Sequence, residues 1–131
     1  MPASSYLANQ ILNHIFRDTA IFTPPTSVWL GLFTGDPGDT GSDNEVAAAD
    51  YARLELDTAS TFAAPSNKRV VNVGDVEFPE AVNDWGVLTH FALFDAETGN
   101  CLVSEELGLS DEVLAGETAR FSAGKLSARV P

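Results

Sequence analysis

The chain has 131 residues, the size of one domain and long enough to build one hydrophobic core. An apolar fraction of 44% excludes disorder throughout, and a single cysteine excludes a scaffold held by disulfides. Nineteen acidic residues against seven basic ones give a net charge of −12, and such a surface repels phosphates. We therefore expect no nucleic-acid partner.

The sequence also predicts no membrane partner. Its apolar runs stay well short of the roughly 18 residues that a membrane span needs. The first ten residues lack the basic and apolar regions of a signal peptide, so we expect a protein made in a reducing compartment.

We expect one domain over residues 1–131, with a helix in residues 1–18 and a β-domain in residues 27–131. Leu7, Ile11 and Ile15 follow the i, i+4, i+8 spacing of an amphipathic helix, and Ser4 or Ser5 is suited to cap it. This apolar stripe either plugs one end of the β-domain or contacts a neighbouring subunit.

After Pro25 the apolar pattern changes to the period of β-strands. Residues 27–34 are apolar on both faces, which predicts a central, buried strand, and residues 87–94 form a second strand of this kind. Shorter strands are predicted at residues 51–59, 68–73, 76–78, 101–103, 118–122 and 125–130. The predicted fold is mainly β, an antiparallel β-sandwich (jelly-roll-like or a barrel) of about seven or eight short strands with one N-terminal α-helix.

A loop rich in glycine and acids follows the first strand. Residues 35–45 include Asp36, Asp39, Asp43 and Glu45, which we expect to be exposed because desolvated acids without paired cations are costly. Their carboxylates are also the hard oxygen ligands that Ca²⁺ takes, although the EF-hand order is absent. A calcium site therefore stays a minor alternative to a solvated loop.

The sequence predicts no catalytic, cofactor-binding or metal-binding residue, and hence no enzyme and no cofactor. The alternative nucleophile is Cys101 with His90 as its base, since the two predicted strands are neighbours. A glycosidase needs paired acids and aromatic platforms, for which Trp29 and Trp85 are the candidates, although both also suit packing.

Several strings together resemble a known family. They are Ser5-Tyr6-Leu7-Ala8-Asn9, Thr23-Pro24-Pro25, residues 28–34, Asn44-Glu45-Val46, Asp50-Tyr51-Ala52-Arg53, Val76-Glu77-Phe78-Pro79, residues 84–95, Ala115-Gly116-Glu117 and residues 121–126. They resemble small virion proteins of tailed bacteriophages that are commonly labelled phage tail fibre proteins. The similarity runs from about Ser5 to Val130, and its most specific part is the Trp-Gly-x-x-Thr-His-x-x-x-Phe-Asp string that begins at Trp85.

The resemblance implies a non-enzymatic virion structural protein, a tail-associated assembly or adhesion module of the tail-fibre or tail-tip type, assembled in the host cytoplasm. Its expected partners are its own copies, as a homo-oligomer, and other phage virion proteins. A decoration or cement protein on the phage head is the alternative, and a small ligand-binding or hydrolytic domain is a weaker one. We expect contacts through sheet edges and through Leu7, Ile11 and Ile15.

Overall fold

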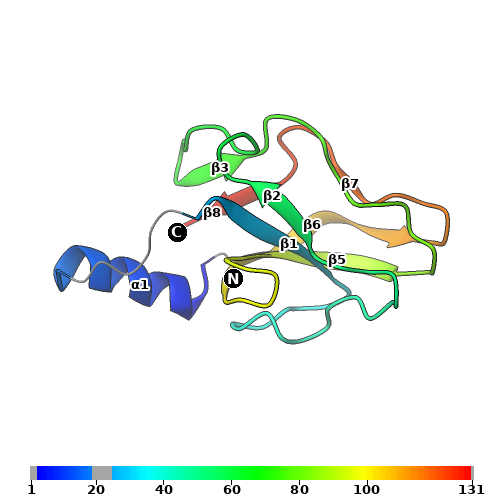
Figure 1. The fold of residues 1–131 in the computed structure, drawn as a ribbon, viewed down its shortest axis with the longest axis horizontal. Helices are drawn as coiled ribbons and strands as arrows, with labels where there is room; N and C mark the ends of the chain where they lie inside the picture. Colours follow the sequence, from blue (N-terminus) through cyan, green and yellow to red (C-terminus); the bar gives the residue numbers. More distant parts are fainter. Residues whose placement is uncertain (1–2, 19–24, 131) are drawn as a thin grey trace.

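The computed structural model describes residues 3–18 and 25–130, with every side chain in these ranges except that of Leu109. This part of the chain forms one helix and eight strands: α1 (Ser5–Phe16), β1 (Ser27–Phe33), β2 (Leu54–Asp57), β3 (Arg69–Val71), β4 (Val76–Glu77), β5 (Gly86–Phe94), β6 (Cys101–Val113), β7 (Arg120–Phe121) and β8 (Ser127–Arg129). Figure 1 shows α1 extending away from the strands at one end of the molecule. No helix in the described residues is long and apolar enough to span a bilayer.

The largest sheet is antiparallel, with the strand order β2-β1-β5-β6. The predicted central position of β1 is confirmed, because β2 flanks it on one side and β5 on the other. The two most apolar strands lie side by side, with Leu30 opposite Leu93 and Gly31 opposite Ala92. Each strand thus covers an edge of the other that water would otherwise reach.

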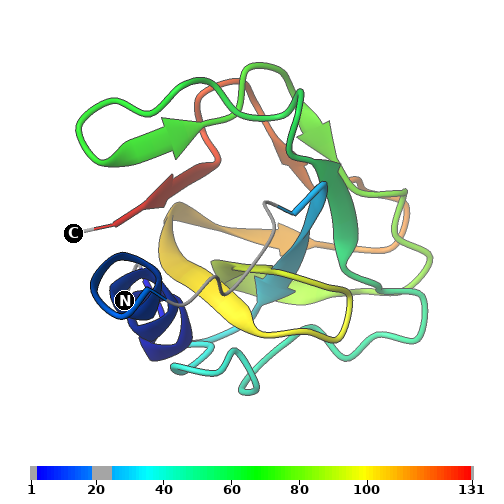
Figure 2. The ribbon, with the colours of Figure 1, turned by 60° about the vertical axis from the view of Figure 1, so that its left-hand side comes forward.

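A second layer faces this sheet and consists of two short antiparallel ribbons, β3–β8 and β4–β7. Figure 2 shows both ribbons on the same side of the four-stranded sheet. The predicted mainly β, antiparallel, sandwich-like fold with one N-terminal helix is confirmed. The barrel form of that prediction is not, because the sheets do not close on each other within the described residues.

Apolar residues on both faces of the sheet form two separate clusters. Val28, Leu30 and Leu32 point inward to the main core between the layers. Trp29 and Phe33 face outward instead. There Phe33 packs with Ala92, Phe94 and Cys101. The rings of Phe33 and Phe94 stack with their centroids 6.3 Å apart. The outer face of the sheet is therefore apolar and needs a cover of its own.

A buried asparagine joins the two ribbons of the second layer. The side-chain amide of Asn72 donates to the carbonyls of Gly74 at 2.7 Å and Ser122 at 3.1 Å, and its oxygen accepts from the backbone N–H of Leu126 at 2.9 Å. Because each of these groups lies at a ribbon end, one side chain satisfies polar backbone that burial would otherwise leave unpaired.

Several predicted boundaries differ from the structure. The strands predicted at residues 51–59, 118–122 and 125–130 are shorter, at Leu54–Asp57, Arg120–Phe121 and Ser127–Arg129. The helix occupies Ser5–Phe16, not residues 1–18, and the strand that was expected to end at residue 103 continues to Val113. The added part of β6 carries charged side chains because one side of it is open to solvent. Its register against β5 also shifts between Leu88 and His90. Solvent exposure and this irregularity hide the alternation by which strands are recognised in sequence.

The core assignment predicts a large cost for Leu30→Ala. Leu30 is fully buried, so the lost contacts and the cavity should lower the free energy of unfolding by about 2–5 kcal/mol. The matched control is Leu114→Ala, which removes the same atoms from an exposed site and should cost less than about 1 kcal/mol. Urea denaturation of both variants measures the difference, and equal costs would contradict the assigned core.

Candidate functional site

The first turn of α1 is attached to β6 by hydrogen bonds. The Ser4 hydroxyl accepts from the backbone N–H of Leu7 at 3.1 Å, as an N-cap does, and donates to the carbonyl of Cys101. The Ser4 backbone N–H donates to the carbonyl of Leu102 at 2.8 Å. Asp39 from the acidic loop accepts from the N–H of Ser5 at 2.9 Å. The root of the helix therefore has a defined position on the sheet.

The three residues of the predicted interface have different surroundings. Leu7 packs against the main core, Ile11 is half-buried and Ile15 is exposed. Two further apolar side chains share the outer half of α1 with Ile15. The exposed fractions are 53% for Leu12, 63% for Ile15 and 76% for Phe16. The base of the stripe thus belongs to the core, whereas its far end has no cover in the described chain.

The acidic loop lies against the outer face of the sheet. Its backbone is tied to the end of β1, where the N–H of Thr34 donates to the carbonyl of Asn44 at 2.9 Å. Gly41 is buried with a φ of +68°, and a Cβ there would lie 2.7 Å from the ring of Phe94. Only glycine permits both this conformation and this close approach. The loop is the cover that the outer cluster needs.

The four acids of the loop fall into two groups. Asp36, Asp39 and Asp43 are exposed in the structure, as the sequence analysis expects. Glu45 differs, because it is half-buried and forms an ion pair with Arg53. The expectation for Glu45 is wrong because it assumes that no cation lies near the loop, and Arg53 approaches from beyond residue 50.

The ion pair has the geometry of a two-point contact. Nε of Arg53 lies 2.9 Å from one carboxylate oxygen of Glu45, and the Arg53 Nη2 lies 2.9 Å from the other. A third donor of Arg53 bonds the carbonyl of Glu97 at 2.8 Å. The guanidinium also sits over the ring of Phe94, 3.5 Å from its centroid. The Arg53 side chain thus holds the acidic loop over the outer apolar cluster.

Asp50 and Tyr51 anchor the acidic loop to the sheet and to the main core. The Tyr51 hydroxyl donates to Glu45 at 2.8 Å and accepts from the N–H of Leu32 at 2.9 Å. Its ring meets Trp85 edge-on, with the centroids 5.4 Å apart. Asp50 accepts from the N–H of Val82 at 2.7 Å and from the indole N–H of Trp85 at 3.3 Å. The Asp-Tyr-x-Arg string is therefore a structural clamp.

The candidate nucleophile and base are not brought together. Cys101 lies opposite Phe94 and His90 lies opposite Glu106, so the two are about four residues apart along the hairpin, roughly 13 Å. The thiol is buried in the outer cluster, and burial together with the negative charge of Asp39 raises its pKa to about 11. Nδ1 of His90 instead forms a hydrogen bond with the hydroxyl of Thr89 at 2.8 Å.

The two tryptophans occupy packing positions. Trp85 is buried, and its ring packs against Tyr51 and Phe78. Trp29 is half-buried on the outer face of β1 against the Phe94 cluster. Their environments match the packing interpretation of both residues.

The proposed calcium ligands face different partners. Asp36 accepts from the N–H of Gly38 at 2.9 Å, Asp39 bonds the root of α1 and Glu45 bonds Arg53. Within residues 3–18 and 25–130, no three His, Cys, Asp or Glu side chains are grouped so that they could hold a metal ion.

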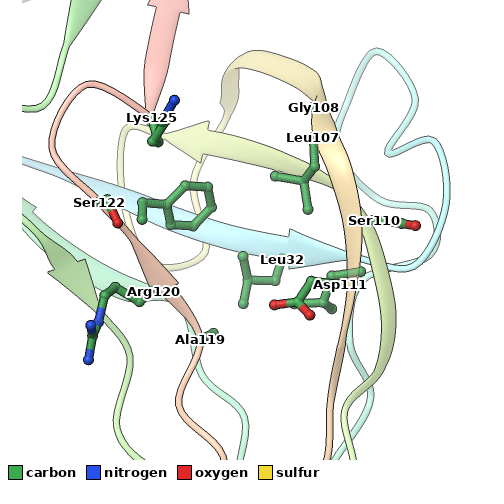
Figure 3. A pocket seen from close by; sticks show the side chains of 11 residues that line it. Leu32, Leu107, Gly108, Ser110, Asp111, Ala119, Arg120, Ser122 and Lys125 are labelled. Atoms are coloured by element: carbon green, nitrogen blue, oxygen red, sulfur yellow. The ribbon is translucent and has the colours of Figure 1, made fainter.

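A groove of about 550 Å³ separates β6 from the segment around β7. Figure 3 shows Leu32 and Leu107 beside this space, while the side chain of Arg120 extends away from them. Arg120 forms an exposed ion pair with Glu77, at 3.3 Å. The walls combine apolar side chains with one carboxylate, that of Asp111, and with the cationic side chains of Arg120 and Lys125.

The sequence as a whole matches the protein family Gp80, described as podophage GP4 fiber I protein gp80, over residues 2–129. The chain belongs to this family. The resemblance to phage tail fibre proteins is thereby confirmed, and the protein is a tail-associated structural protein and a virion component. No curated protein matches the chain.

The clamp in this Gp80 family member predicts a destabilising effect of Arg53→Met. The substitution leaves Glu45 charged beneath the loop. Because 16% and 23% of the two side chains remain exposed, the cost should be about 2–3 kcal/mol, below the range of fully buried pairs. Arg120→Met is the matched control, since 55% and 43% of that pair are exposed and its loss should cost under about 1 kcal/mol. If urea denaturation gave equal losses of unfolding free energy for the two variants, the larger contribution assigned to the Glu45–Arg53 pair would be contradicted.

A second prediction concerns pH. The hydrogen bond from the N–H of Val82, followed by those from Asn83 and Trp85, lowers the pKa of Asp50 despite the opposing effect of desolvation. A carboxyl group whose pKa is lower in the folded state stabilises the protein above its unfolded pKa of about 3.9, and this contribution is lost as the pH falls through the folded pKa. The melting temperatures of the parent and Asp50→Asn should therefore differ most near neutral pH and converge below about pH 4.

Asp43→Asn is the control for this pH series, because it removes the same charge from an exposed position of the loop. Its melting temperature should follow that of the parent at every pH. If the melting temperatures of Asp50→Asn and Asp43→Asn depended on pH in the same way, the hydrogen bonds of Asp50 would not contribute to the pH dependence of stability.

Proposed function

We propose that this protein is a non-enzymatic building block of a phage tail, incorporated through contacts with its own copies and with other virion proteins during assembly in the host cytoplasm. The observation that carries this proposal is the match to the podophage fiber I family over residues 2–129. A match of this extent covers the helix, both layers and the clamp, so the relationship applies to the whole described fold.

The chemistry of the candidate catalytic residues supports a structural role. A cysteine nucleophile reacts as the thiolate, and a buried thiol with a pKa of about 11 is protonated at neutral pH. The nearest candidate base, His90, lies on the far part of the hairpin and is bonded to Thr89.

Surface chemistry favours α1 as a contact surface over the β2 edge of the four-stranded sheet. The edge strand β2 is four residues long, and its Glu55 and Asp57 are exposed, which is a common way to protect an edge from pairing. The outer half of α1, in contrast, offers Leu12, Ile15 and Phe16 to solvent. Exposed apolar side chains that cluster in this way mark interaction surfaces.

The proposal predicts how variants enter phage particles. Cys101→Ala and His90→Ala should be incorporated at the parental copy number, whereas Leu12→Asp should be strongly depleted because it places a charge on the contact surface. Val73→Asp is the control, since it adds the same charge to an exposed apolar site outside α1. Quantitative mass spectrometry of purified particles gives the copy numbers. Depletion of Cys101→Ala with an unchanged melting temperature would contradict a purely structural role.

A further inference from the structure

The groove beside β6 separates two strand edges. β6 is the last strand of the four-stranded sheet, and β7 pairs with β4 alone among the described strands. Figure 3 shows Leu107 on the β6 side of this space of about 550 Å³ and Ser122 on the opposite side, with Leu32 between them. A strand placed in this space would join the two layers and cover both edges, which are otherwise open to pairing.

The β6 edge is poorly suited to accept a new strand. Its first part is already bridged, since Ala3 pairs with Val103. Further along, Thr89 of β5 faces the four β6 residues 107–110 by itself, because the register between the two strands shifts there. A bulge of this size interrupts the regular pattern of backbone groups along an edge. β6 therefore forms one wall of the groove, and the bulge keeps this wall away from β7.

The β7 edge, in contrast, has a regular pattern of free backbone groups. The N–H of Phe78 donates to the carbonyl of Ala119 at 2.9 Å, in the register that pairs β4 with β7. Successive residues of an antiparallel strand direct their backbone groups to opposite edges, so those of Thr118 and Arg120 point away from β4. No strand of the described chain pairs with this edge. Thr118 and Arg120 therefore present N–H groups and carbonyls at alternate residues, as strand addition requires.

The core side of the groove requires apolar side chains from such a strand. Leu32, Leu88 and Phe121 line it, and each is less than a tenth exposed. Side chains along a strand alternate between the two faces of a sheet. Every second residue of an added strand therefore points to these three side chains and is apolar, since a polar group without a partner is costly there.

Charge selects the residues on the outward face of the added strand. Arg120 and Lys125, two of the seven basic residues of the chain, line the groove, against the single acid Asp111. Arg120 is paired with Glu77, whereas the ammonium group of Lys125 forms no ion pair within the part of the chain that the structure describes. A segment with an acidic side chain on its outward face is therefore attracted here. The approach of a whole second copy, which also carries −12, is opposed by like charge.

We propose that the groove between β6 and β7 binds an extended segment of another virion protein, which adds a strand to β7. The backbone of Thr118 and Arg120 supplies the hydrogen bonds, and pockets for alternate side chains supply the specificity. The segment carries apolar residues at its inward positions and an acidic residue beside Lys125. This inference deepens the proposed function, on which it rests, by naming a contact surface on the β-domain and the chemistry of the partner.

Photo-cross-linking in purified phage particles tests the site and its occupant. The photoreactive residue benzoylphenylalanine replaces Leu107 or Ser122, on facing walls of the groove, and mass spectrometry identifies the cross-linked peptides. Both positions should capture the same segment of another virion protein, with apolar residues at alternate positions and an acid between them. The probe in place of Val73, which is exposed outside the groove, should not capture that segment.

Two results of this experiment would overturn the proposal. One is the absence of an adduct from particles that contain the Leu107 and Ser122 variants, and the other is an adduct with a second copy of this chain. Both results leave the structural role intact, because the protein is still present in the particle. Absence of the parental chain from purified particles would instead contradict the proposed function.

Lys125→Glu tests the assigned charge. It should lower the cross-linking yield at position 107 by about tenfold, because like charges then face each other. Lys68→Glu is the matched control, since it makes the same charge reversal at an exposed lysine outside the groove and should leave the yield unchanged. Equal yields for the two variants would contradict the acidic residue in the segment.

Hydrogen exchange tests the strand pairing. A synthetic peptide with the captured sequence is added to the purified full chain. Exchange of the amide hydrogens of Thr118 and Arg120 should then slow by about tenfold or more, because they become hydrogen-bonded. The amide hydrogen of Ala119, which is directed to β4, is the internal control and should change little. Unchanged exchange at Thr118 and Arg120 with the peptide bound would overturn strand addition.

Discussion

The ion pair of Glu45 and Arg53 over Phe94 is the contact on which the outer half of this structure depends. The four-stranded sheet is apolar on both faces, and the second layer covers only the inner one. The outer face is covered by the acidic loop. Carboxylates are destabilised when they are buried against an apolar ring such as that of Phe94. The arrangement is stable because Arg53 neutralises the one acid that is drawn inward, while Asp36, Asp39 and Asp43 remain at the surface.

The same short segment joins the two faces of the sheet. Glu45 and Arg53 lie on the outer side, whereas the ring of Tyr51 packs against Trp85 and Phe78. Asp50 holds the turn that leads to Trp85 and β5. Three strings that resemble the phage family, which lie apart in the sequence at residues 44–46, 50–53 and 84–95, therefore meet in space. Their shared role in the clamp gives the resemblance a physical basis.

Sequence patterns predicted the features that arise from local periodicity. β1 and β5 were recognisable because their residues are apolar on both faces, and α1 because Leu7, Ile11 and Ile15 repeat at helical spacing. The ion pair was not recognisable, since nothing near Glu45 in the chain shows that Arg53 turns back to it. The role of Asn72 was hidden for the same reason, because its partners Ser122 and Leu126 lie about fifty residues further along. Contacts made by tertiary folding leave no periodic trace.

The pairing of β1 with β5 has a consequence for how the chain folds. Leu30 and Leu93 are 63 positions apart, so the sheet forms only after a long stretch of chain has closed on itself. Such non-local pairing is slow, and until it occurs the run Val-Trp-Leu-Gly-Leu-Phe of β1 has a free edge and no charge. During synthesis β1 leaves the ribosome well before its partner strand. The nascent chain is therefore most prone to aggregate in that interval, and a fragment that ends before Gly86 lacks the strand that protects it.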